Sequence, residues 1–321
     1  MKAVGLSSHP NDFLGVRVTS EELLRLRGDA ARLAPKAADT VSSLFPGAYR
    51  TLIRGRGLDF EEVRAYQPGD DYRTLDWRVT ARTGKLHTKV FHEEREHNVY
   101  FVVDGSPSMH FGTRSAYKFV VAARAAALLA WVAVDNGDKA GGMVFGDGSA
   151  IHEQGPFAGA TGAAHLFGML ELASTRGGGG EVDNRSTLSS ALQALRRLVR
   201  PGSLVLVISD FLNRGADFER HLNRLARNND VAGLLVSDPL ERSFPEDGIY
   251  PVSDGVRSLW VDGGDDDFSK AFSNVFTVNN EETGAVFRRS RCRLFDLGTE
   301  QPVLDGLRRA LFGIGGGGDF G

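Results

Sequence analysis

The most chemically suggestive part of the sequence is a short polar turn that directly follows an apolar run. Val99 to Val103 are consecutive strand-forming residues, and the chain then continues with Asp104-Gly105-Ser106-Pro107-Ser108. One carboxylate and two hydroxyls therefore stand at every second position of the turn. Such hard oxygen donors are the ligands that Mg²⁺ or Mn²⁺ prefers. We predict a divalent-metal site here; the alternative is an ordinary strand-ending turn, because Asp, Gly, Ser and Pro all favour turns.

Two later positions are predicted to complete this site. Thr187 precedes a helical pattern, and Asp210 directly follows the apolar strand pattern 203–209. The C-terminal ends of parallel strands lie along one edge of a sheet, so these loops are expected to meet there. Ser186 is an alternative to Thr187 as ligand, and either hydroxyl could instead cap the helix. The predicted metal ligands are Asp104, Ser106, Ser108, Thr187 and Asp210.

Three catalytic alternatives are weaker. A phosphatase that uses Asp104 as nucleophile would need a second Asp two residues later, where this chain has Ser106. The chain has no G-x-x-x-x-G-K-[ST] sequence, so the glycine run 177–180 is expected to be a loop. His92 and His97 are five residues apart, so they do not share one helical face as zinc ligands would. A hydrolase that activates water with the same metal remains an alternative, although no general base stands at a diagnostic spacing.

Strand and helix patterns alternate from residue 98 to residue 312, which predicts an α/β fold with a doubly wound, mostly parallel sheet. The expected strands are 98–104, 139–146, 149–154, 203–209, 231–237 and 292–297. The expected helices are 115–135, 160–174, 186–199, 216–228, 266–289 and 300–312, and 240–263 is expected to form a hairpin or an irregular edge.

The remaining segments differ in character from this alternating region. Residues 1–50 are predicted to be an N-terminal helical arm, with one helix from about Thr19 to Leu33. Residues 51–97 are dense in charges of both signs and are predicted to form a small β-rich subdomain, whose strands are joined by loops. Its surface is either self-neutralising or a partner-docking face. The glycine-rich tail 313–321 is expected to be flexible.

Composition narrows the class of protein. The chain has 321 residues with a net charge of −3, which gives no overall field for nucleic acid, although a local basic patch is possible. The only cysteine, Cys292, fits a reducing compartment. The N-terminus lacks the apolar core of a signal peptide. The longest apolar stretch, 117–134, contains Lys118 and Arg124, so it is expected to be a buried helix and not a membrane span. We expect a soluble, cytoplasmic protein.

The motifs together resemble two known patterns. The Asp-x-Ser-x-Ser turn, the later Thr and the later Asp resemble the metal-ion-dependent adhesion site of von Willebrand factor A domains. The preceding stretch resembles a bacterial family known as domain of unknown function 58, which combines such a domain with three further motifs. They correspond here to Gly57-Leu58-Asp59-Phe60, Pro68-Gly69-Asp70-Asp71 and Asp76-Trp77-Arg78-Val79-Thr80-Ala81-Arg82, within a match over about 50–260.

The resemblance implies a von Willebrand factor A-like domain at 98–312 and a non-catalytic function. The expected partners are a MoxR-type AAA+ ATPase and a client protein, linked by this chain as an adaptor. An acidic side chain of a partner would occupy the open position on the Mg²⁺ or Mn²⁺. A metal-free scaffold that binds through the β-rich face is a further alternative.

Overall fold

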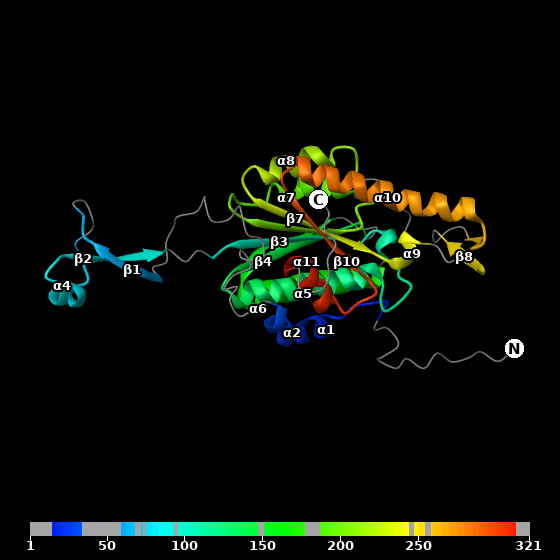
Figure 1. Ribbon diagram of the computed structural model, residues 1–321. Coiled ribbons are helices and arrows are strands. Elements are labelled where there is room, and N and C mark those ends of the chain that lie inside the picture. Colours follow the sequence, from blue (N-terminus) through cyan, green and yellow to red (C-terminus); the bar gives the residue numbers. More distant parts are fainter. Residues whose placement is uncertain are drawn as a thin grey trace. The chain divides into compact units, whose positions relative to one another are not determined.

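The computed structural model describes residues 15–33, 59–67, 72, 75–92, 96–146, 151–176, 187–243, 247–253 and 258–312 (Figure 1). The chain forms two compact units. The larger unit contains Met1–Ala48 and His97–Gly321, and the smaller contains Tyr49–Glu96. The expected tail 313–321, the glycine run 177–180 and Ser186 lie outside the described residues.

The larger unit is built on a six-stranded sheet with the order β10-β7-β6-β3-β4-β5. Its strands are β3 (Asn98–Asp104), β4 (Lys139–Phe145), β5 (His152–Ala158), β6 (Leu204–Ser209), β7 (Asp230–Ser237) and β10 (Arg293–Gly298). All neighbours pair in parallel except β4 and β5, which are antiparallel. The predicted α/β fold with a doubly wound, mostly parallel sheet is therefore confirmed. The strand expected at 149–154 lies further along the chain, at β5.

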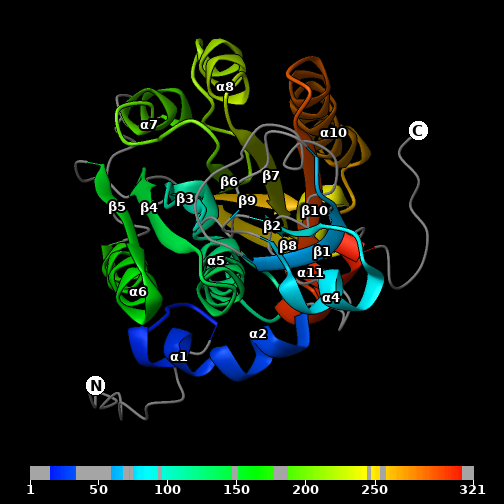
Figure 2. The ribbon, with the colours of Figure 1, turned by 90° about the vertical axis from the view of Figure 1, so that its left-hand side faces the viewer.

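Helices cover both faces of this sheet (Figures 1 and 2). One face carries α5 (Lys118–Asp135), α6 (Gly159–Arg176) and α11 (Val303–Phe312), and the other carries α7 (Leu188–Leu195), α8 (Phe218–Ala226) and α10 (Asp266–Arg289). The apolar stretch that the sequence marked as a buried helix is α5, and most of its side chains are buried. Of the helices in the described residues, none combines the length and apolarity that a membrane crossing requires.

Two short helices at the N-terminal side pack on α5 and α6. They are α1 (Ser20–Arg25) and α2 (Arg27–Leu33), whereas the sequence predicted one continuous helix. The cap at Thr19 is as predicted, because its side chain accepts a hydrogen bond from the backbone of Glu22. The indole of Trp131 donates to the backbone oxygen of Leu23 at 3.1 Å, which fixes α1 on α5.

The smaller unit contains an antiparallel pair, β1 (Asp59–Ala65) and β2 (His87–His92). The prediction that loops alone join its strands is wrong, because α4 (Trp77–Thr83) lies between them. Asp76 caps this helix by accepting hydrogen bonds from two backbone amides, and the left-handed Gly84 ends it. The motif Pro68-Gly69-Asp70-Asp71 lies outside the described residues.

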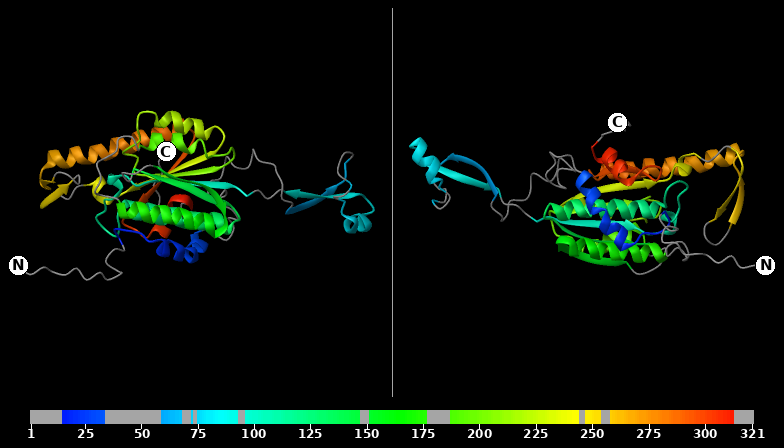
Figure 3. Two further views of the ribbon diagram at one scale, coloured as in Figure 1. Left: turned by 180° about the vertical axis from the view of Figure 1, so that it is seen from behind. Right: turned by 90° about the horizontal axis from the view of Figure 1, so that it is seen from below.

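The segment after β7 contains a short helix and a hairpin. Helix α9 (Pro239–Arg242) precedes β8 (Ile249–Ser253) and β9 (Ser258–Asp262), which pair antiparallel. The hairpin expected within 240–263 is therefore confirmed. In the views of Figure 3, α10 extends past the ends of the sheet strands to this hairpin. Its residues 267–282 are all exposed or only partly buried, so this part of the helix lies largely outside the core.

Candidate functional site

Asp104 is the last residue of β3, and its side chain is fully buried at the C-terminal edge of the sheet. One carboxylate oxygen, Oδ1, accepts the backbone N–H of Ser106 at 2.9 Å, so the carboxylate itself shapes the turn. The other oxygen, Oδ2, accepts the hydroxyl of Ser209 at 2.5 Å. Ser209 ends β6, the neighbouring strand. The Asp104 side chain thus joins the C-terminal end of β3 to the C-terminal end of β6.

The pKa of Asp104 is raised to about 7. Burial is the largest cause, and the negative charge of Asp210 is the second; hydrogen bonds from Ser209 and Ser106 oppose them. The structure thus brings these two predicted ligands close enough for their charges to repel. A bound cation would relieve this repulsion.

The two hydroxyls of the turn lie together. Ser106 Oγ and Ser108 Oγ are 3.1 Å apart. In an octahedral shell with Mg–O distances of about 2.1 Å, adjacent ligand oxygens are about 3.0 Å apart. The spacing of these hydroxyls therefore fits two neighbouring positions around one small divalent cation.

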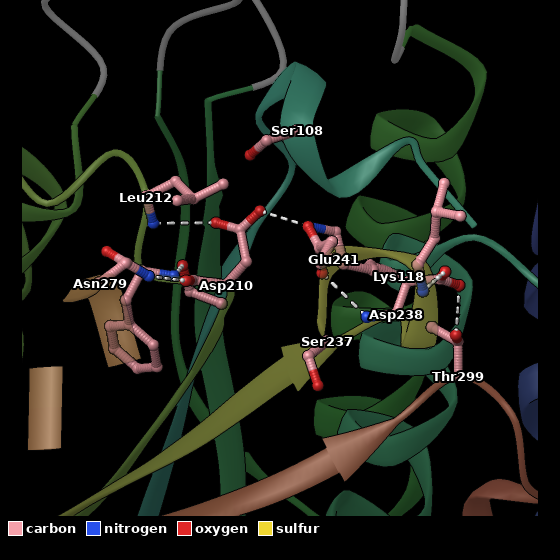
Figure 4. A network of polar contacts seen from close by, with 12 residues as sticks. Ser108, Lys118, Asp210, Leu212, Ser237, Asp238, Glu241, Asn279 and Thr299 are labelled. Carbon is pink, nitrogen blue, oxygen red and sulfur yellow. Dashed lines mark hydrogen bonds and ion pairs between the residues drawn. The ribbon is translucent and has the colours of Figure 1, made fainter. Parts of the chain in front are cut away.

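Asp210 follows β6 directly and is almost fully buried. Its Oδ1 accepts the backbone N–H of Leu212 at 3.0 Å, and its Oδ2 accepts the ammonium of Lys118 at 2.8 Å (Figure 4). Phe211, which lies between Asp210 and Leu212 in the chain, has a φ of 56°, in the left-handed region that non-glycine residues rarely adopt. Backbone strain of this kind concentrates at functional sites.

Lys118 is the main feature that the sequence did not predict. Its side chain is completely buried at the start of α5, and its ammonium bonds both Asp210 and, at 2.5 Å, Glu241 of α9 (Figure 4). Burial alone would lower the pKa of Lys118, but the two carboxylates outweigh burial and raise it. Lys118 is therefore a permanent internal cation at the edge of the site.

A second buried carboxylate, Asp238, extends this network along the sheet edge. It accepts the hydroxyls of Thr113 and Thr299, each at 2.6 Å, and its backbone N–H donates to Glu241 at 2.8 Å (Figure 4). Burial would raise the pKa of Asp238, but the hydrogen bonds that it accepts from Thr113, Thr299 and Leu240 lower it. Polar residues thus link the ends of β6, β7 and β10.

Thr187 caps α7. Its Oγ1 accepts the backbone N–H of Ser190 at 3.3 Å, and the Ser190 hydroxyl accepts the backbone N–H of Thr187 at 2.9 Å. The hydroxyl also lies beside Gly215, where a Cβ would come within 2.8 Å of it. The cap that the sequence offered as an alternative is therefore present. A ligand role for Thr187 remains a prediction, and Ser186 lies outside the described residues.

The donor set fits a hard divalent cation, which prefers oxygen ligands. Two carboxylates and two adjacent hydroxyls belong to the turn after β3 and the end of β6. Asp104, Asp210, Asp238 and Glu241 are four carboxylates along this edge, and the ammonium of Lys118 bonds two of them, so the edge keeps a surplus of negative charge when all are ionised. Within the described ranges, His, Cys, Asp and Glu side chains form no metal-binding group of three or more, so hydroxyls or water would have to supply the other ligands.

The residues that the sequence analysis missed did leave signals. Lys118 interrupts an otherwise apolar run, and charged side chains are rarely buried without a partner. Asp238 and Glu241 stand three residues apart around Pro239, which is the pattern of a helix capping box, and the structure contains that box. No sequence pattern pointed to Ser209, because its hydrogen bond to Asp104 depends on the pairing of β6 with β3.

Comparison with known proteins identifies relatives. Residues 62–282 match the family model described as "Protein of unknown function DUF58". The chain is 34% identical to uncharacterized protein Rv1480 of Mycobacterium tuberculosis over 268 residues, which cover 82% of this chain and 81% of that protein.

Similar solved structures include the conserved hypothetical protein BatB from Bacteroides thetaiotaomicron. It is 16% identical, with a TM-score of 0.42, over 67% of this chain and 97% of BatB. Another is a von Willebrand factor type A protein from Catenulispora acidiphila. It is 16% identical, with a TM-score of 0.31, over 47% of this chain and 35% of that protein.

Proposed function

The chain belongs to the DUF58 family of proteins of unknown function, as its motifs indicated, and we propose a function for it on this basis. In this proposal the chain is a non-catalytic protein-binding module that depends on a divalent metal. Asp104, Ser106, Ser108 and Asp210 would hold Mg²⁺ or Mn²⁺, with Thr187 as a further ligand. The ion would supply a positive charge at which an acidic side chain of a partner protein docks.

The observation that carries this proposal is the uncompensated negative charge at the end of β3. Asp104 has no exposed surface, and its pKa is raised by burial and by Asp210. A buried carboxylate without a cation is costly, and it either takes up a proton or binds a positive partner. A dication would allow both carboxylates to stay ionised.

Apolar side chains beside the site support a protein partner. Leu212 follows Asp210 by two residues and is 47% exposed. Asn279 of α10 donates to the backbone oxygen of Asp210 at 3.2 Å, and the adjacent Val278 is 42% exposed. Exposed apolar groups around a charged centre are typical of protein interfaces, where they exclude water around the central contact.

The partners that the family resemblance suggests are a MoxR-type AAA+ ATPase and a client protein. In this proposal the chain is an adaptor between them, in chaperone-like assembly or maturation of the client. Such an ATPase needs ATP, and a chain with a single cysteine suits a reducing compartment, so we place this interaction in the cytoplasm.

Metal-free binding is a second candidate because of Lys118. Its buried ammonium already bonds Asp210, so an internal cation offsets part of the negative charge. In this alternative the fold would bind its partner through the β-rich unit, and chelators would have no effect. The two candidates are separated by one experiment.

The experiment is a pull-down from cytoplasmic extract with the tagged chain, in Mg²⁺ or in EDTA, read by mass spectrometry. The variants are Asp104→Asn, which removes one site charge without changing shape, and Asp305→Asn, a matched charge control at an exposed position of α11. Capture of an AAA+ ATPase by the wild type and by Asp305→Asn in Mg²⁺ only, with loss in Asp104→Asn, is the expected result.

Equal capture with chelator or with Asp104→Asn would show that docking does not use the metal. A parallel assay with phosphoester and peptide substrates in Mg²⁺ or Mn²⁺ tests the hydrolase alternative. Turnover that disappears in Asp104→Asn would replace the binding proposal with an enzymatic one.

A further inference from the structure

A cavity of about 710 Å³ lies at the other end of the sheet from Asp104, where β6, β7 and β10 begin. The last turn of α8 and the end of α10 form its sides. Its apolar wall includes Leu204, Ala226 and Val231. Ligand cavities are commonly 300–1,000 Å³, so this cavity has a suitable size, and its lining combines these apolar side chains with many polar and charged ones.

The cavity is lined by more positive than negative charge. Its charged lining residues are Arg227, Arg289, Arg291, Arg293 and Asp230. One of the four guanidiniums is paired with a carboxylate that does not line the cavity, because Arg289 makes two 2.8 Å hydrogen bonds to Glu219. Among the described residues, Arg227 and Arg291 have no carboxylate within ion-pair distance.

Two positive charges therefore remain after Asp230 and Glu219 are counted. The C-terminal ends of α8 and α10 also face this region, and each contributes about half a negative charge. Together they offset about one of the two remaining charges, so the helix dipoles alone do not account for the arginines. The cavity keeps a positive surplus that an anion could satisfy.

Arg291 occupies a backbone position that normally selects glycine. It follows Ser290, the C-cap of α10, with a φ of 55°, and the hydrogen bonds from Cys292 N to Phe287 O and from Arg291 N to Arg288 O complete a Schellman motif. Glycine is favoured here because it has no Cβ to strain a left-handed backbone. An arginine at this position contradicts the local preference, and such exceptions concentrate at functional sites.

Ser290 supplies a buried hydroxyl to the same cavity. The residue is 6% exposed, and its Oγ has no hydrogen-bond partner within the part of the chain that the structure describes. Buried polar atoms are nearly always hydrogen-bonded, so this unpaired hydroxyl is an exception at the wall of the cavity.

Further exposed arginines lie outside the cavity lining, on the helices of the same sheet face. Exposed arginines of α7, α8 and the segments that follow them are Arg196, Arg197, Arg200, Arg220 and Arg224. Burial, and then the charges of Arg220 and Arg196, lower the pKa of His221 on α8, and Arg220 is itself paired with Asp217 at 2.8 Å. The whole chain has a net charge of −3, so this group of arginines is a local feature.

We propose that this cavity binds a small phosphate-bearing molecule of up to nucleotide size. Arginine presents planar pairs of N–H donors that match phosphate oxygens, and Arg227 and Arg291 are available to do so. The apolar wall accommodates the organic part of the ligand. The site is independent of the metal at the opposite sheet edge, because none of its lining residues belongs to that network.

The test is isothermal titration calorimetry on the full chain, with inorganic pyrophosphate and with ATP, in 150 mM salt and EDTA. EDTA removes any contribution from the metal site, so the outcome is separate from that of the proposed function. The key variant is Arg291→Gly, which removes the cation while relieving the left-handed backbone, so it is expected to fold at least as well as the wild type. Arg227→Gln is the second variant.

Saturable binding of ATP or pyrophosphate, with Kd raised about tenfold in Arg291→Gly and in Arg227→Gln, is the expected result. Arg197→Gln, at one of the exposed arginines outside the cavity lining, is the matched control and should bind as the wild type does.

Three results would overturn the proposal. They are the absence of saturable binding, an equal weakening in Arg197→Gln, and tight binding of duplex DNA or anionic phospholipid vesicles that pyrophosphate does not compete with. The second and third would indicate a diffuse basic surface instead of a site.

Discussion

At the scale of single residues, the charge balance at the sheet edge depends on one ammonium group. Lys118 is fully buried and bonds Asp210 and Glu241, whereas most ion pairs in the described residues, such as Arg25 with Glu21, are exposed to water. Removing one partner of a buried ion pair leaves an uncompensated charge, and removing an exposed one changes little. The two kinds of pair therefore predict different mutational costs.

Lys118→Met is expected to lower the free energy of unfolding by about 3–5 kcal/mol, because Asp210 and Glu241 lose their shared counter-charge. Urea denaturation at pH 7.5 in EDTA measures this. Arg25→Met is the matched control and should cost at most about 1 kcal/mol, since its ion pair is exposed. Similar costs for the two variants would contradict the assignment of Lys118 as the internal cation.

Cys292 is expected to be an unreactive thiol. Burial, followed by the charge of Asp230, raises its pKa to about 12, so almost no thiolate is present at neutral pH. Alkylation by iodoacetamide at pH 8, followed by mass spectrometry, should be slow in the native chain and fast in 8 M urea. Because the chain has one cysteine, each modified molecule reports this residue alone. Equally fast alkylation in both states would show that the thiol is accessible.

The sequence predicted those site residues whose positions are set by a single strand and the turn that follows it. Asp104 and Asp210 were predicted because each directly follows a buried apolar strand, and the structure brings their charges together. Lys118 and Glu241 were missed because their contact joins α5 to α9, and no local pattern specifies which buried charge meets which. Long-range pairing is a property of the packed fold and not of either segment.

At the scale of elements, the packing of α8 lowers the pKa of one of its histidines. Its buried residue, His221, has an Nδ1 without a hydrogen-bond partner in the described residues, and burial with nearby arginines lowers its pKa. The folded-state pKa therefore lies below the unfolded value of about 6.5. Between about pH 5 and 7 the unfolded chain binds more protons than the folded chain does, so stability rises with pH across this window.

His221→Gln is expected to flatten that dependence, because the buried group no longer titrates. Unfolding free energies from urea denaturation at pH 5.5, 6.5 and 7.5 measure the slope. His165→Gln, at an exposed position of α6, is the control and should keep the wild-type slope. An unchanged slope in His221→Gln would assign the pH dependence to other groups.

Element types were easier to predict than element boundaries. The strands of the large sheet and the helices between them follow from hydrophobic period and length, and α10 begins and ends where the sequence indicated. Helix α4 was missed because the segment was interpreted by its strand-like flanks, although Asp76 and Gly84 are the usual residues of a helix start and end. The break between α1 and α2 had no clear signal, since Leu26 and Arg27 both favour helix.

At the scale of the whole molecule, the proposed metal should act as a stabilising ligand. A ligand that binds only the folded state at 100 times its Kd adds about 2.7 kcal/mol, which corresponds to a rise of several degrees in Tm for a unit of this size. We expect 10 mM Mg²⁺ to raise the Tm of the wild type relative to EDTA, and to leave Asp104→Asn unchanged. Differential scanning fluorimetry measures both.

Asp305→Asn is the control for the loss of one carboxylate, and its response to Mg²⁺ should match that of the wild type. NaCl at the same ionic strength, which has no divalent cation and no oxyanion, excludes a general salt effect. A wild-type Tm that is insensitive to Mg²⁺ would favour the metal-free alternative, in which Lys118 is the cation that bonds Asp210.

The packing of α5, the helix at the centre of one sheet face, has a consequence for folding during synthesis. α5 is covered by α2 from the N-terminal side of the chain and by α11 from the C-terminal side, and α2 and α11 contact each other. The ribosome releases the N-terminal helices long before α11 is synthesised. During that interval the Ala- and Leu-rich surface of α5 has only part of its cover, and exposed apolar surface on a nascent chain promotes aggregation. The full cover of α5 therefore forms only after α11 has been synthesised.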